Sequence, residues 1–263
     1  MQFIKGRQFS FVRPLEGPNV RNARANEFPF VVSIMRLKSG QYLQPENDHV
    51  CTGSLITLRD VATAAHCVVN EMKISIRIII GSTDIRLGQR YYPFWWLTYD
   101  VWAHRKGIQP QVDFNDIVNI RLTAAVPNSI VPAEIPNIPN ARLNRLQVIA
   151  VAWGILNGTH TNPFLKAANL QVISYRRSLE IIGSSYQPLD IIETPSLLTY
   201  MQPHVILSYG DSGGPLLYRH QLVGIHSGVC PKNQEVDNNH LINVHASMHY
   251  YRAFFLDVRY SGN

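Results

Sequence analysis

The sequence predicts an all-β fold, either a barrel or a sandwich. Most of the chain consists of short apolar runs separated by glycine, proline and asparagine turns, the pattern of short antiparallel strands. The clearest run is 74–80, where an isoleucine at every second position alternates with Ser75, Arg77 and Ile79. A stretch with four prolines at 127–140 has no periodicity, and it connects two halves of similar size.

The remaining elements follow from the same apolar patterns. We expect further strands at 30–35, 61–64, 148–152, 169–175, 215–218, 221–226 and 241–246. Only the C-terminal end has the spacing of a helix, since Tyr251, Phe254, Phe255 and Val258 recur at intervals of three and four. This apolar stripe is expected to dock on the core.

Composition and charge exclude several classes of protein. The chain has 263 residues, of which 46% are hydrophobic and 16% charged, as in an ordinary globular domain. The net charge of +6 is scattered along the sequence. Its densest basic spots, Arg176–Arg177 and Arg142 with Arg145, are too small to argue for nucleic acid, and we expect them to be solvated faces.

Neither a membrane anchor nor a signal peptide is visible in the sequence. A spanning helix needs about 18–20 consecutive apolar residues, and no run approaches that length. Lys5 and Arg7 interrupt the first twelve residues, which therefore lack the apolar core of a secretory signal.

The motif GDSGGP at 210–215 is the strongest chemical signal in the chain. Its chance appearance in a chain of this length is on the order of 10⁻⁵. Glycines on both sides of Ser212 let the backbone turn sharply and expose the hydroxyl. Main-chain amides held in such a turn suit the stabilisation of a developing oxyanion. The alternative is a glycine-rich hairpin with an incidental serine.

A serine hydroxyl needs a base, and the base needs a group that orients it. His66 lies in the apolar run TAAHC, and is therefore the histidine among ten that is best fixed in position. Asp116 is followed by an apolar Ile-Val pair, so its carboxylate enters a buried strand. Burial of a carboxylate is costly unless it accepts hydrogen bonds, and an imidazole N–H would supply one.

These residues lie within a series of motifs that resembles the chymotrypsin/trypsin family of serine proteases. The motifs appear in the family's order and are CTGSLI (51–56), VATAAHC (61–67), NDIV with IRL (115–122), AWG (152–154), GDSGGPL (210–216) and LVGIHS (222–227). The insect chymotrypsin-like branch is the most similar. The order His, Asp, Ser also separates the chain from α/β-hydrolases and subtilisins.

The resemblance implies a role for each site residue. Ser212 would be the acylating nucleophile, His66 the general base and then acid, and Asp116 the group that orients the imidazole. The N–H groups of Gly210 and Ser212 would form the oxyanion hole. Ser227 matches the family serine near the buried aspartate.

The resemblance also implies the architecture: two antiparallel six-stranded β-barrels with a C-terminal α-helix. We expect a pro-like segment at 1–17 and one peptidase domain at 18–263. Within that domain the first barrel would span about 26–127, the connector 128–145, and the second barrel with the helix 146–260. A secreted monomer follows, acting on protein or peptide substrates and met by protein protease inhibitors, with no cofactor, no metal and no nucleic-acid or membrane partner.

Activation is the first departure from the family pattern. Family members are cut after a basic residue, and the new amino group pairs with the aspartate before the catalytic serine, here Asp211. The expected cleavage segment is replaced by 13–17, in which Arg13 precedes Pro14 and is therefore a poor cleavage site. Without a cation, a buried Asp211 would be costly.

The small number of cysteines is the second departure from the family pattern. Cys51 and Cys67 bracket a short segment that ends in the AAHC motif, and we pair them, for a stabilisation of about 3 kcal/mol. Cys230 is left over, and either stays reduced or bonds to another chain. It matches a cysteine that usually closes the pocket, but the position of its partner is Ser208.

Three residues describe the specificity pocket by resemblance. Ile206, six residues before Ser212, would lie at its floor, Gly228 at its entrance and Asn243 at a third position. Because none of them is a carboxylate, we expect an apolar P1 preference and not Arg or Lys. Core packing is an equally good interpretation of Ile206.

Two alternatives stay open, and one further motif bears on secretion. A non-catalytic homologue could retain the fold as a binding or decoy protein, and a nucleic-acid or heparin binder lacks a supporting basic cluster. The sequon Asn157-Gly158-Thr159 supports secretion weakly.

Overall fold

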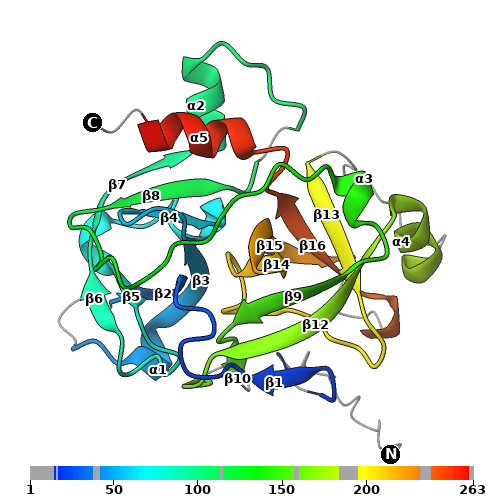
Figure 1. The fold of residues 1–263 in the computed structure, drawn as a ribbon, viewed down its shortest axis with the longest axis horizontal. Coiled ribbons are helices and arrows are strands. Elements are labelled where there is room, and N and C mark those ends of the chain that lie inside the picture. The colour runs from blue at the N-terminus through cyan, green and yellow to red at the C-terminus, as the bar shows by residue number, and fades with distance from the viewer. Residues whose placement is uncertain are drawn as a thin grey trace, which may run out of the picture.

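The structure is a computed structural model, and it describes residues 15, 17–37, 42–112, 115–156, 160–183, 195–231 and 238–260. Two rolled antiparallel sheets lie side by side, and Figure 1 shows them as a blue-to-green half and a green-to-red half that also carries the dark-blue strand β1. The expected all-β class with a C-terminal helix is confirmed. Parts of the activation segment (Arg13, Pro14 and Glu16) and the sequon at 157–159 lie outside the described residues.

The first sheet has seven strands in the order β6-β5-β2-β3-β4-β8-β7. Their bounds are β2 (Val31–Arg36), β3 (His49–Leu55), β4 (Asp60–Thr63), β5 (Ile76–Ile80), β6 (Gln89–Tyr91), β7 (Pro93–Thr98) and β8 (Val118–Leu122). The end strands β6 and β7 do not pair with each other in the described part of the chain. This half is therefore a rolled sheet and not a barrel closed by hydrogen bonds.

The second sheet closes on itself. It comprises β1 (Val20–Asn22), β9 (Gln147–Ala152), β12 (Lys166–Ile173), β13 (Ser196–Tyr200), β14 (Pro215–Tyr218), β15 (Gln221–Cys230) and β16 (Ile242–Ser247). Strands β9 and β12 pair from Lys166↔Ala152 to Gln171↔Gln147, which completes a six-stranded barrel. Strand β1 adds to the outside of β12, and β10 (Ile155–Leu156) pairs with β11 (His160–Thr161) as a separate ribbon.

The expectation of a single helix was wrong. Besides α5 (Arg252–Tyr260), the structure contains α1 (Pro45–Asp48), α2 (Tyr99–Arg105), α3 (Asn140–Leu143) and α4 (Tyr175–Ile182). Both longer additions begin at a hydroxyl cap: Thr98 accepts a hydrogen bond from Val101 N, and Ser174 accepts one from Arg177 N. The strand expected at 169–175 therefore ends at Ile173, where the cap of α4 follows.

The run at 74–80 is also shorter as a strand than its alternation predicts. Residues Lys73–Ser75 form a 3₁₀ turn, and Ile74 is 76% exposed. All four isoleucines of β5 (Ile76, Ile78, Ile79 and Ile80) are buried, whereas Arg77 is half-buried, and the strand pairs with β2 on one edge and β6 on the other.

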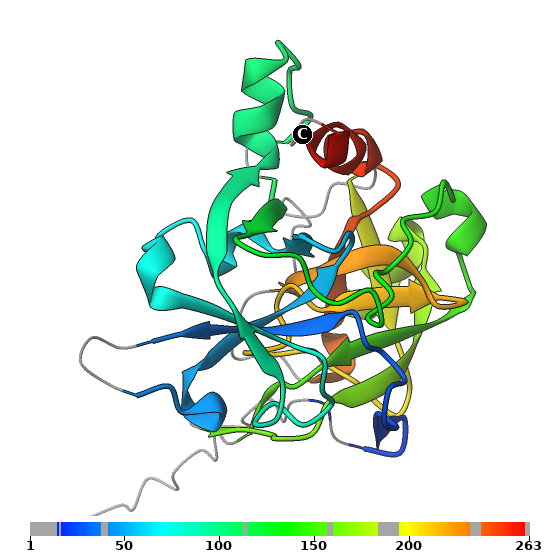
Figure 2. The ribbon, with the colours of Figure 1, turned by 60° about the vertical axis from the view of Figure 1, so that its left-hand side comes forward.

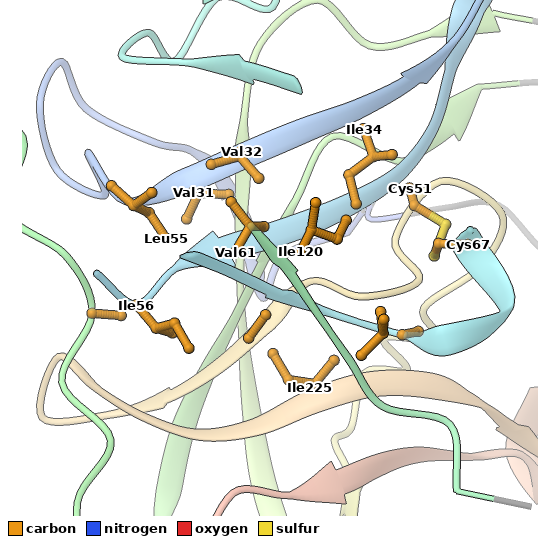
Figure 3. Close-up of a cluster of buried hydrophobic side chains, with 14 of the residues drawn as sticks. Val31, Val32, Ile34, Cys51, Leu55, Ile56, Val61, Cys67, Ile120 and Ile225 are labelled. Carbon is orange, nitrogen blue, oxygen red and sulfur yellow. A yellow bond between two sulfur atoms is a disulfide. The ribbon is translucent and has the colours of Figure 1, made fainter. Parts of the chain in front are cut away.

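The core fixes the two halves against each other. The largest buried cluster joins first-sheet residues such as Val32 and Ile120 to Ile225 of β15 and to Phe254 and Phe255 of α5. Figure 3 shows part of this cluster, with Ile225 facing the first sheet and the Cys51–Cys67 bridge at its edge. Figure 2 shows α5 lying beside α2 above the sheets. The candidate site residues lie where the two halves meet.

Candidate active site

His66 is held in a rigid turn. It is the middle residue of a 3₁₀ turn, Ala65–Cys67, that follows strand β4. The next residue, Cys67, bonds to Cys51 of β3 with 6.1 Å between the Cα atoms, which confirms the expected disulfide. Ala65 and Cys67 are buried while the His66 side chain is 41% exposed. The imidazole therefore projects from an anchored turn into the open.

Asp116 fixes the orientation of this imidazole. Its Oδ2 lies 2.8 Å from His66 Nδ1, and its Oδ1 accepts a hydrogen bond of 2.9 Å from the backbone N–H of His66. Ser227 of β15 donates a third hydrogen bond, of 2.5 Å, to Oδ2. The first two bonds come from one half of the molecule and the third from the other. The carboxylate thus joins the two halves at the site.

These contacts set the protonation of the pair. Burial alone would raise the pKa of Asp116, but the hydrogen bonds from His66 and Ser227 bring it below its usual value. The hydrogen bond to Asp116 raises the pKa of His66, against the opposing effect of burial. Asp116 is therefore ionised at neutral pH and accepts a hydrogen bond from Nδ1–H of a neutral His66, whose Nε2 is then available as a base.

The loop that carries Ser212 is locked by glycines. Gly213 has φ of +78°, and a Cβ there would lie 2.0 Å from Thr63 Oγ1 and 2.2 Å from Thr52 O. Thr52 N donates to Ser212 O at 2.8 Å, so the loop lies against the strands that lead to His66. Ser212 Oγ forms no hydrogen bond with His66 or with any other described residue. Catalytic contacts of this kind often form only when substrate binds.

Two backbone amides of the same loop are unused. Among the described residues, neither Gly210 N nor Ser212 N donates a hydrogen bond, although the intervening Asp211 N donates to Ser208 O. Gly210 has φ of +84°, a conformation that favours glycine. The two free N–H groups are suited to bind an oxyanion beside Ser212.

His49 supports this loop, and the sequence analysis missed it. His49 Nε2 lies 2.9 Å from Gly210 O, which also accepts a 2.9 Å bond from Thr52 Oγ1. Ser33 Oγ lies 2.7 Å from His49 Nδ1. Burial lowers the pKa of His49 to about 4, so the ring is neutral, donates a hydrogen bond through Nε2 and accepts one at Nδ1 from the Ser33 hydroxyl. Nothing in the sequence distinguishes His49 from the other histidines.

Asp211 is buried, and its carboxyl forms no ion pair among the described residues. Its Oδ2 accepts a 2.8 Å hydrogen bond from Ser208 N, whereas Oδ1 has no partner among the described residues. The residue is fully buried, and burial raises the pKa of its carboxyl to about 8. Ser212 thus follows directly after a buried carboxyl group whose Oδ1 has no partner among the described residues.

The residues expected in the specificity pocket lie on three segments. Asn243 of β16 holds the segment containing Ile206 with both polar atoms of its amide, since Oδ1 accepts from Leu207 N at 2.8 Å and Nδ2 donates to Val205 O at 2.9 Å. Ile206 is buried but belongs to none of the hydrophobic clusters. A Cβ on Gly228 would face open space. Asn243 is therefore a brace for the segment and not a free polar group.

A pair of buried histidines behind Ser212 was also missed. His226 and His245 face each other across β15 and β16, with ring centroids 5.3 Å apart. His226 accepts from Gly213 N and donates to Gly214 O through its backbone, so it braces the Ser212 loop. Burial lowers the pKa of His245 to about 3 and that of His226 well below its usual value. Both rings are neutral and add no charge beside His66.

The described residues hold no convincing metal site. Their one group of three potential ligands is Cys51, His66 and Cys67, and both cysteine sulfurs are already joined in the disulfide. Among the described residues, no helix is both long and apolar enough to cross a lipid bilayer.

A comparison with known proteins establishes the family. The family model named Trypsin matches residues 18–254, and the chain therefore belongs to the trypsin family of serine proteases. Mouse neutrophil elastase is 27% identical over 213 residues, which cover 79% of this chain and 70% of that protein. Trypsin of Xenopus laevis is 27% identical over 199 residues, 75% of this chain and 73% of that protein. The solved structure of neuropsin, a serine protease of mouse brain, superposes with a TM-score of 0.68 at 20% identity, covering 91% and 98% of the two chains.

Proposed function

We propose that this trypsin-family chain is a serine endopeptidase that hydrolyses peptide bonds through an acyl-enzyme. One observation carries the proposal: an imidazole oriented by a three-bonded carboxylate at the junction where the loop of Ser212 presents two free amides. A base, its orienting group, a serine and oxyanion donors are the parts that acyl transfer needs.

The reaction uses these parts in sequence. Ser212 Oγ attacks the scissile carbonyl carbon while His66 Nε2 takes the hydroxyl proton, and Asp116 stabilises the imidazolium that forms. The N–H groups of Gly210 and Ser212 bind the oxyanion. His66 then gives its proton to the departing amine as the C–N bond breaks. Water repeats the attack on the ester, and Ser212 is released with the second product, a carboxylic acid.

We propose that the chain is a zymogen and that a cation on Asp211 completes the oxyanion hole. Asp211 lies one residue from both Gly210 and Ser212, so movement of its carboxyl towards a cation turns both amides. The buried Oδ1 without a partner supports such an acceptor role. Because Arg13 precedes Pro14, the bond after Arg13 is a poor cleavage site. The charge would therefore come from an amino terminus made by a cut at another bond, or from another cation.

The proposed P1 preference is for an apolar side chain. Ile206, Gly228 and Asn243 include no carboxylate that could bind Arg or Lys, and both polar atoms of the Asn243 amide already bond to the backbone. The buried Ile206 outside the hydrophobic clusters is consistent with an apolar floor.

We further propose that the protein is secreted, monomeric, free of cofactors and open to protein protease inhibitors. The Cys51–Cys67 disulfide supports an oxidising compartment.

Peptide hydrolysis by the N-terminally processed protein tests the proposal. A P1 peptide library should be cleaved after apolar residues, and Ser212→Ala should lower the rate by about 10⁴-fold or more. Cleavage mainly after Arg or Lys would refute the apolar P1 preference but not the protease activity. Absence of any hydrolysis by processed protein would contradict the enzyme and favour the non-catalytic binding protein.

A further inference from the structure

A hollow of about 600 Å³ lies at one end of the second barrel, away from the triad. It forms where the ends of β12 and β13 meet the beginning of α4, near α3 in Figure 1. Its volume is in the range of sites that bind small molecules or single groups of a larger ligand. None of the triad residues lines it. The lining that matters here comprises Arg145, Arg176, Arg177, Gln171, Tyr200 and Gln202.

The fold brings together two basic spots that are far apart in the sequence. Arg145 N donates to Val172 O at 2.8 Å, and Gln171 Nε2 donates to Arg145 O at 3.1 Å. Arg145 has φ of +65°, a conformation that costs a non-glycine residue about 1 kcal/mol or more. Both of its backbone polar groups hold it there. Gln171 and Val172 belong to β12, which leads into α4. The first turn of α4 places Arg176 and Arg177 at the same hollow.

The hollow has a positive charge that is only partly compensated. Three guanidinium groups line it against one carboxylate, that of Glu180. Glu180 lies 2.9 Å from Arg177 and 3.7 Å from Arg176, whose side chains are 58% and 92% exposed. Within the described ranges no carboxylate lies within 4.0 Å of Arg145. Guanidinium groups in this state bind sulfate and phosphate oxygens in pairs of hydrogen bonds.

The other lining residues indicate what carries the anions. Amide and hydroxyl groups surround the arginines, and Gln202 Nε2 donates to the Tyr200 hydroxyl at 2.8 Å. Such groups suit the hydroxyls of a sugar. A single-stranded nucleic acid would need a row of aromatic platforms along a groove, and Tyr200 is the one aromatic side chain in this lining. The chemistry therefore favours a sulfated sugar chain over a nucleic acid.

We propose that this hollow binds a sulfated polysaccharide, with Arg145, Arg176 and Arg177 binding its sulfate groups. The site is independent of the proposed protease activity. Because the triad lies elsewhere, a bound chain leaves Ser212 accessible and anchors the protein to a polyanionic matrix.

Heparin affinity tests this site directly. A Ser212→Ala background prevents self-digestion, and Arg145→Gln/Arg176→Gln/Arg177→Gln is compared with the matched triple change Arg90→Gln/Arg105→Gln/Arg259→Gln. Both remove three charges from exposed positions. The parent and the control should elute from heparin at the same salt concentration. The site variant should elute earlier, with a Kd for a heparin octasaccharide raised roughly 10-fold or more.

Three outcomes would overturn the proposal: no binding of heparin by the parent, equal weakening in both triple variants, or equally tight binding of a single-stranded oligonucleotide of the same charge. If the triple variant fails to fold, Arg176→Gln/Arg177→Gln leaves the backbone at Arg145 intact and changes only exposed side chains. An unchanged Kd in that folded double variant would equally contradict the assignment.

Discussion

Two carboxyl groups of the candidate site, half-buried Asp116 and fully buried Asp211, have opposite environments. Asp116 accepts three hydrogen bonds, which lower its pKa below the ordinary value despite burial. Asp211 accepts one, and burial raises its pKa to about 8. Both are acids in the same site, so the difference comes from the number of donors that face each of them.

We infer that this difference separates the part of the site proposed for catalysis from the part proposed for activation. The His66 side is fully bonded, anchored by a disulfide and ready to act as a base. The Ser212 side has its glycines and free amides in place, but the Asp211 carboxyl on this side forms no ion pair within the described part of the chain. We infer that the base is pre-organised and that the oxyanion hole is the part that activation completes.

Replacement of Asp116 should have the largest effect. Asn at this position cannot accept from both His66 N–H groups and Ser227, and it favours the wrong imidazole tautomer. The corresponding change in the reference triad of this family lowers kcat by about 10⁴-fold, and we expect the same size here in steady-state assays. The pKa of His66 should also fall, so that the acidic limb of kcat/KM moves to lower pH. An unchanged rate would show that Asp116 does not orient the base.

The pH dependence of stability should distinguish the two aspartates. Asp211 binds its proton more tightly in the folded state, so its contribution is fully present below about pH 4 and is lost as pH rises towards 8. Asp211→Asn removes this loss. The difference in unfolding free energy between Asp211→Asn and the wild type, measured on unprocessed protein by urea unfolding, should therefore shift in favour of the variant by as much as about 5 kcal/mol between pH 4.5 and pH 8.5.

Asp116 should behave in the opposite way. Its lowered pKa stabilises the fold at neutral pH, and that stability is lost as pH falls through the folded-state pKa. The prediction for Asp211 fails if the unfolding free energies of the wild type and Asp211→Asn change with pH in parallel, because the Asp211 carboxyl would then have a cationic partner.

The Ser212 loop should not tolerate a side chain at Gly213. A Cβ would clash with Thr63 and with the Thr52 carbonyl, and φ of +78° adds strain, so Gly213→Ala should cost about 3–4 kcal/mol in thermal unfolding. Gly228→Ala is the matched control, because a Cβ there meets nothing within 4 Å, and it should change stability by less than about 0.5 kcal/mol. Equal losses would show that the loop is not locked by its glycine.

Loss of the Cys51–Cys67 disulfide should lower stability slightly less than Gly213→Ala does. Cys51→Ala/Cys67→Ala opens a loop of sequence separation 16 and should lower the free energy of unfolding by about 3 kcal/mol. Cys230→Ala, which breaks no disulfide among the described residues, is the control and should cost about 1 kcal/mol or less. A negligible effect of the double change would mean that the first sheet alone holds the His66 turn.

Local patterns predicted much of this molecule, and long-range contacts account for what they missed. The strand at 215–218 and the apolar stripe on α5 were predictable because alternation and helical spacing report burial directly. The helix α4 was missed because its apolar residues continue the pattern of β12, and only the Ser174 cap marks its start. The hydrogen bond from His49 to Gly210 joins residues 161 apart, and no local pattern reports such a pairing.

The most direct measurement is covalent labelling with a fluorophosphonate, read by mass spectrometry on mature protein whose N-terminus has been sequenced. The account predicts one adduct, on Ser212, in N-terminally processed protein, with much slower labelling of Asp116→Asn and of unprocessed material. Processed protein that forms no adduct, or forms it on another residue, would contradict the claim that His66, Asp116 and Ser212 are a working catalytic site.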